Sequence, residues 1–99
     1  GALVGFVTVH GDELDLLFVG STGRGTGVAR TLLREGERRI AEAGHAVAWL
    51  EVMERNARAR HFYWREGWRD TGPMTGTAVT PAGTFDIAAR RYEKHLATV

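Results

Sequence analysis

The 99-residue chain contains no cysteine. Disulfide bonds, thiolate metal sites and cysteine nucleophiles are therefore excluded. The chain also has no marked excess of charge, because 13 Lys and Arg residues are balanced by 12 Asp and Glu, for a formal net charge of +1. Domains that bind nucleic acid usually carry a clear basic excess, so no nucleic-acid partner is expected.

Long apolar runs are absent as well. None approaches the ~18 residues that a membrane-spanning helix needs, and no secretory signal opens the chain. We therefore expect a cytoplasmic protein with no membrane partner. The four histidines are scattered without the spacing of metal ligands, so we expect no metal and interpret them as surface or capping residues: His10, His45, His61 and His95.

The pattern of apolar runs and turn residues predicts one α/β unit. Strands are expected at residues 3–9, 14–19 and 46–52, and helices at 28–43 and 57–66. Residues 71–83 are rich in turn residues, with only a short extended run at 77–80. Residues 85–95 predict a closing strand, although a helix stays open there. The run at 14–19 is almost entirely apolar, which is typical of an inner strand covered on both faces.

Local signals mark the ends of the two helices. Gly44 and Gly67 stand where each helix would end in a left-handed residue, and Asn56 stands where the second would be capped. Glu35 and Arg39 are spaced to pair across one turn of the first helix.

A glycine-rich segment, Arg24-Gly25-Thr26-Gly27-Val28-Ala29, lies between the second strand and the first helix. The backbone N–H groups and the positive dipole end of a helix that opens in such a turn favour a phosphate. A Walker loop would need Gly-Lys-Ser/Thr, and a dinucleotide fingerprint a third small residue; the segment has neither. An ordinary connection between strand and helix is the structural alternative.

Two segments together resemble the acetyl-CoA-binding motifs of the GNAT superfamily of N-acetyltransferases. The first is Arg24-x-x-Gly27-x-Ala29, and the second is Asn56-x-x-Ala59-x-x-Phe62-Tyr63-x-x-x-Gly67-Trp68, in which Trp68 replaces the usual Phe. The resemblance covers nearly the whole chain and corresponds to the family's C-terminal, cofactor-binding portion, without the family's N-terminal elements. It implies an α/β (α+β) fold in which helices flank a mixed open sheet, in the order β-β-α-β-α-β-β. It also implies a single, incomplete domain over residues 1–99.

The resemblance further implies that an acetyl group passes from acetyl-CoA to a primary amine by direct attack. Val19 would provide a main-chain donor to the thioester carbonyl. The residues that the resemblance assigns to acetyl-CoA are Phe18, Val19, Arg24, Gly25, Thr26, Gly27, Val28, Ala29, Asn56, Ala59, Phe62 and Tyr63.

Transfer to an amine poses two proton problems. A lysine-like amine has a pKa of ~10.4, so a carboxylate acting directly or through water would lower the cost of deprotonation. Glu13 is the candidate base, although a solvated strand end is the alternative; Asp15 on the same strand face and Glu51 on the neighbouring strand also carry carboxylates. The Tyr63 hydroxyl would protonate the leaving thiolate, whereas Phe62 and Trp68 are interpreted as core.

Other classes of function stay open at this point. The chain is also compatible with a non-catalytic acyl-CoA-binding module, or with a half-domain completed by another chain, including a second copy in a homodimer. The amine acceptor, a small molecule or a peptide, is not defined by the sequence.

Overall fold

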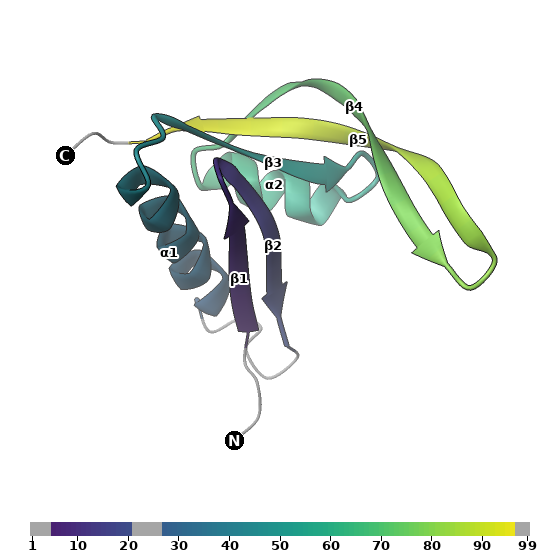
Figure 1. Cartoon of the computed structure of the whole chain (residues 1–99), viewed down its shortest axis with the longest axis horizontal. Coiled ribbons are helices and arrows are strands. Elements are labelled where there is room, and N and C mark those ends of the chain that lie inside the picture. Colours follow the sequence, from purple (N-terminus) through teal and green to yellow (C-terminus); the bar gives the residue numbers. More distant parts are fainter. Residues whose placement is uncertain (1–4, 21–26, 97–99) are drawn as a thin grey trace. The chain divides into compact units, whose positions relative to one another are not determined.

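The computed structural model describes residues 5–20 and 27–96. Seven elements follow one another along the chain: β1 (Gly5–His10), β2 (Glu13–Val19), α1 (Val28–Glu42), β3 (Val47–Met53), α2 (Ala57–Arg65), β4 (Arg69–Thr80) and β5 (Gly83–His95) (Figure 1). They fall into two compact units, residues 1–48 with 95–99 and residues 49–94, and β3 begins in the first unit and continues into the second. Neither described helix is long and apolar enough to cross a membrane.

This element order confirms the predicted one. The left-handed helix ends are confirmed too, since Gly44 and Gly67 have φ of 98° and 97°. The Glu35–Arg39 pair is present, with Oε1 and Nε 3.1 Å apart. The closing segment is a strand, β5, and not a helix.

The first unit is an antiparallel β1–β2 hairpin with α1 packed along it (Figure 1). Close packing depends on Gly36 of α1, because a Cβ there would lie 2.8 Å from Leu14 Cδ1 and 3.1 Å from Val7 Cγ2. Leu33 and Ile40, on the same helix, have no exposed surface. The apolar stripe of α1 therefore buries one face of the hairpin.

The prediction that both faces of β2 are covered is wrong. Leu16 and Phe18 remain 48% and 44% exposed, and the Phe18 ring stacks on that of Phe6 with the centroids 5.4 Å apart. Leu14 contacts α1, but a β-bulge opposite Thr8 and Val9 adds one residue to β2 between Leu14 and Leu16, so Leu16 and Phe18 point to the face of the hairpin that α1 does not cover. An apolar run alone does not distinguish a strand covered twice from one covered once.

In the second unit β5 lies between β3 and β4. β4 and β5 form a long antiparallel hairpin, paired from Arg69 with Glu93 to Thr80 with Gly83 (Figure 1). Trp68, which leads from α2 into β4, is fully buried. The other buried apolar residues of this unit are Leu50, Val52, Ala89 and Tyr92.

The expectation of turns over residues 71–83 is wrong, because β4 occupies most of this stretch. Pro73 is tolerated since β4 is the last strand in the order β3-β5-β4, and an edge strand can lack a donor. Gly72 has φ of 138° beside a β-bulge, and Gly76 has no room for a Cβ next to the Glu51 side chain. These turn-forming residues therefore meet local demands of a strand that pairs with β5.

Candidate functional site

The N-terminus of α1 is the first part of the candidate site. Gly27 caps it with φ of 84°, no described side chain caps the helix, and its first turn holds no acidic residue. A Cβ at Gly27 would meet no atom of the described residues within 4 Å. The first-turn N–H groups and the dipole of a helix N-terminus suit an anion, so the described residues here fit a phosphate-bearing ligand. Half-buried Val28 and Ala29 form the first turn, whereas Arg24, Gly25 and Thr26 lie outside the described residues.

Strand β2 places two of the predicted site residues at opposite ends. Glu13 opens the strand opposite His10, and Val19 closes it opposite Gly5. At ~3.4 Å per residue, six steps separate them by about 20 Å. The structure therefore does not bring the Glu13 carboxylate to the Val19 main chain. Phe18, beside Val19, is on the face that α1 leaves open.

Helix α2 carries the second predicted motif. The Asn56 side chain accepts a hydrogen bond from the Ala59 N–H at 3.1 Å, which confirms the predicted cap. Ala59 and Phe62 are half-buried on this helix. Of the two aromatic residues interpreted as core, Trp68 is fully buried, whereas Phe62 is only partly so.

Tyr63 lies within a cluster of aromatic rings. Its ring centroid is 5.4 Å from that of Phe62, 6.2 Å from that of Trp68 and 6.4 Å from that of Tyr92. This burial raises the pKa of the Tyr63 hydroxyl above its ordinary value. No hydrogen bond joins that hydroxyl to another described residue, and among these residues no fully buried side-chain polar atom lacks a partner.

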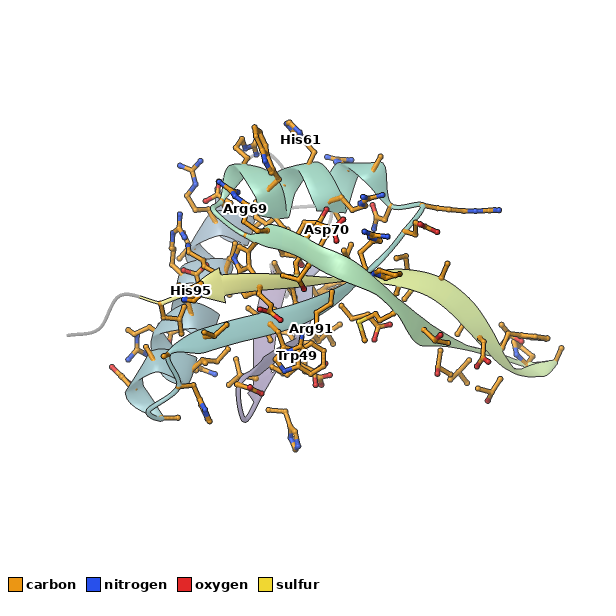
Figure 2. The ribbon with its side chains drawn as sticks, turned by 90° about the horizontal axis from the view of Figure 1, so that it is seen from above. Trp49, His61, Arg69, Asp70, Arg91 and His95 are labelled. Atoms are coloured by element: carbon orange, nitrogen blue, oxygen red, sulfur yellow. The ribbon has the colours of Figure 1, made fainter. Side chains whose placement is uncertain are left out.

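Sequence reasoning gave little weight to Glu51. It is half-buried on β3, and a Cβ on Gly76 of β4 would collide with its carboxylate. Trp49, two residues earlier on the same face of β3, is covered by the Arg91 guanidinium at 4.2 Å from the ring centroid (Figure 2). The signal that would have identified Glu51 is Gly76, which faces it from 25 positions away in the chain, in a stretch where the sequence predicts turns.

The end of β3 also borders a small pocket. It has a volume of about 330 Å³ and is lined by Met53, Arg55, Ile87 and Ala88. All four lining residues belong to the second unit.

The histidines are on the surface, as predicted: His10, His45, His61 and His95 are all exposed. The His61 ring stacks on that of Trp64, with the centroids 5.8 Å apart. Within residues 5–20 and 27–96, no group of three or more His, Asp or Glu side chains is arranged to hold a metal ion.

Comparison with known proteins points to one family. A model described as "Acetyltransferase (GNAT) domain" matches residues 1–79. Uncharacterised N-acetyltransferases of Mycobacterium bovis and Mycobacterium tuberculosis are 31% identical over 80 residues, which cover 76% of this chain and 51% of each relative. The chain thus spans about half the length of the curated relatives it matches.

Solved structures agree on the fold. A nourseothricin acetyltransferase is similar at a TM-score of 0.79 and 28% identity, with 98% of this chain and 60% of that one covered. A GCN5-related N-acetyltransferase from Rhodopseudomonas palustris is similar at a TM-score of 0.78 and 23% sequence identity, with 97% of this chain and 56% of that one covered. A GNAT acetyltransferase from Elizabethkingia anophelis, solved with acetyl-CoA bound, is similar at a TM-score of 0.70 and 11% sequence identity, with 85% of this chain and 60% of that one covered. The mixed open-sheet fold with flanking helices is therefore confirmed.

Proposed function

Because the chain belongs to the GNAT acetyltransferase family, we propose that its protein transfers an acetyl group from acetyl-CoA to an amine. The observation that carries the proposal is the N-terminus of α1, where no described side chain caps the helix and no described atom would lie within 4 Å of a Cβ on Gly27. Such a helix end favours a phosphate group. The acetyl-CoA bound to the related Elizabethkingia protein supports the same ligand.

The cofactor is assigned to residues of both motifs. In this proposal the segment from Arg24 to Ala29 receives the pyrophosphate through its backbone N–H groups. Phe18 and Val19 contact the pantetheine arm, and the Val19 N–H polarises the thioester carbonyl. Asn56, Ala59, Phe62 and Tyr63 contact the cofactor from α2.

The reaction then needs one base and one acid. The base removes a proton from the ammonium form of the acceptor, and the neutral amine attacks the carbonyl carbon, so that a C–N bond forms as the C–S bond breaks. Tyr63 donates its phenolic proton to the departing sulfur, and the second proton of the attacking nitrogen, released as the amide forms, returns through solvent to the Tyr63 phenolate. Its raised pKa keeps that proton in place at neutral pH.

Two carboxylates compete for the role of base. Glu13 lies about 20 Å along β2 from Val19, so it could serve a thioester there only through a chain of waters. Glu51 is half-buried on β3 and directed toward Gly76. Glu13 stays the proposed base, acting through water, and Glu51 is the second candidate. Glu13→Gln should lower the rate more than Glu51→Gln, and the reverse order would assign the role of base to Glu51.

Calorimetric titration with acetyl-CoA tests the cofactor site. Gly27→Glu should abolish binding, because it adds bulk and negative charge at the N-terminus of α1, where the phosphates are proposed to bind. Gly44→Glu is a matched control, because Gly44 has a similar positive φ and a Cβ there would also meet no described atom within 4 Å, but it lies beyond the other end of α1. If both variants bind as tightly as the unaltered protein, α1 does not hold the phosphates.

Turnover is measured separately, by the release of free CoA thiol with a panel of amines. Acetyl-CoA-dependent release with at least one amine supports the enzyme. Tight binding without release from any amine would instead favour a non-catalytic acyl-CoA-binding module.

A further inference from the structure

A cluster of charged side chains ties α2 to β4 and β5 in the second unit. At its centre, the Asp70 carboxylate accepts hydrogen bonds from Arg90 Nε at 3.0 and 3.2 Å and from the Gly72 N–H at 3.0 Å. Asp70 also pairs with Arg60 of α2, with Nη2 and Oδ2 3.3 Å apart. Figure 2 shows Asp70 on β4, beneath α2. The bulge between Asp70 and Gly72 gives the carboxylate its backbone donor.

Arg60 connects this cluster to the aromatic residues. Its guanidinium donates to the Tyr92 hydroxyl at 3.2 Å and to the Glu54 carbonyl at 2.9 Å, in addition to its pairing with Asp70. Three partners on three segments hold the planar guanidinium in one orientation. The Tyr92 ring is buried, so its hydroxyl depends on Arg60 for a partner.

Tyr92 in turn contacts Tyr63. The two rings are 6.4 Å apart at an interplanar angle of 57°. Tyr63 follows Arg60 by three positions on α2, so the two side chains occupy the same side of the helix. The chain of contacts Asp70–Arg60–Tyr92 therefore ends on the ring whose hydroxyl is assigned as the acid.

We propose that Asp70, Arg60 and Tyr92 are positioning residues that hold the Tyr63 ring in its catalytic orientation. The inference rests on the proposed function, in which Tyr63 protonates the leaving thiolate. A proton donor must lie within hydrogen-bond reach of its acceptor, and a displacement of about 1 Å can cost roughly 10²-fold in rate. None of the three residues needs to touch either substrate.

Tyr92→Phe is the sharpest variant, because it keeps the ring against Tyr63 and removes only the hydroxyl that Arg60 contacts. We expect kcat to fall roughly 10- to 100-fold with the KM for acetyl-CoA unchanged, and Asp70→Asn to act in the same direction. Glu93→Gln is the control, because Glu93 adjoins Tyr92 on β5. The variant loses the ion pair of Glu93 with Arg91, in which the two atoms are 2.8 Å apart, and this pair does not involve α2. Glu93→Gln should leave kcat unchanged. An unchanged kcat in Tyr92→Phe, with thermal unfolding showing the variant folded, would overturn the proposal.

A double variant separates positioning from a general loss of stability. If Tyr92 acts through Tyr63, adding Tyr92→Phe to Tyr63→Phe should lower kcat no further. An equal further fall in that background would show that Tyr92 acts elsewhere, which also overturns the proposal. If Tyr63→Phe alone leaves kcat unchanged, it is the assignment of the acid in the proposed function that fails.

A second readout does not depend on turnover. NMR of the Tyr63 ring should show faster ring flipping in Tyr92→Phe and Asp70→Asn than in the unaltered protein, and no change in Glu93→Gln. Equal flipping rates in all four proteins would overturn the positioning role whether or not the protein turns over an amine.

Discussion

Tyr63 combines an enclosed ring with a hydroxyl that has no hydrogen-bond partner among the described residues. Enclosure raises its pKa, because desolvation penalises the phenolate. Because the pKa of Tyr63 is higher in the folded protein than in the unfolded chain, its contribution to stability is fully present below pH 10.0, the ordinary pKa of tyrosine. That contribution is lost as the pH rises through the pKa of Tyr63 in the folded protein. The same shift keeps the proposed acid protonated throughout the neutral range.

Replacing Tyr63 by Phe should therefore lower kcat by roughly 10²- to 10⁴-fold, the usual contribution of a general acid, while acetyl-CoA affinity stays nearly constant. Steady-state kinetics with acetyl-CoA varied at saturating amine measures both quantities. The pH profile of the unaltered protein should show no Tyr63-dependent fall below about pH 10. A fall near pH 8 that disappears in Tyr63→Phe would contradict the raised pKa.

At the scale of the element, α2 depends on Asn56 for its start. Asn56→Ala should destabilise the protein by about 1 kcal/mol, because the Ala59 N–H loses its acceptor. Asn56→Ser retains a capping oxygen and should restore most of that stability. If Asn56 also contacts pantetheine, as proposed, the KM for acetyl-CoA should rise in both variants. Chemical denaturation measures the cap, and a KM unchanged in both variants would confine Asn56 to capping.

Helix α1 depends on Gly36 for its approach to the hairpin. Gly36→Val should destabilise the protein by about 1 to 3 kcal/mol, since its side chain would overlap Leu14 and Val7. Ala41→Val puts the same side chain at a half-buried position of the same helix and, unlike Gly36→Val, lowers the helix propensity, so it serves as the control. In urea denaturation, only Gly36→Val should unfold at a midpoint concentration well below that of the unaltered protein. Equal midpoints for the two variants would show that the space at Gly36 is not limiting.

At the scale of the whole molecule, net stability should respond to acid through Asp70. Hydrogen bonds from Arg90, then from the Gly72 N–H, and the charge of Arg60 hold its pKa below the ordinary 3.8. Because the pKa of Asp70 is lower in the folded protein than in the unfolded chain, its contribution to stability is present above pH 3.8. That contribution is lost as the pH falls through the pKa of Asp70 in the folded protein.

The difference in free energy of unfolding between the unaltered protein and Asp70→Asn should accordingly be constant near neutrality and shrink below about pH 3.8. Denaturant titrations at a series of pH values measure it. Asp86→Asn, which removes an exposed carboxylate on the same hairpin outside the Asp70 cluster, is the control for the change in net charge. A difference for Asp70→Asn that persists to the lowest pH would show that its carboxylate is not held ionised by the arginines.

Local signals made most of the architecture predictable. The order of the elements as far as α2, the Asn56 cap and the left-handed Gly44 and Gly67 depend on local signals, so the sequence by itself determined them. The two cofactor motifs identified the family for the same reason: each is a short segment whose spacing is visible without the fold.

Only the tertiary structure decided the rest. Residues 71–80 form a strand because β5 supplies its partner, against their own turn preferences. Arg60 meets Asp70 and Tyr92 across 10 and 32 positions of sequence, and Gly76 makes room for Glu51 from another strand. Such contacts depend on how strands pair and on which faces helices cover. The sequence pattern indicates the dihedral preference and the hydrophobicity of each residue, but it does not indicate which distant residue each one will contact in the fold.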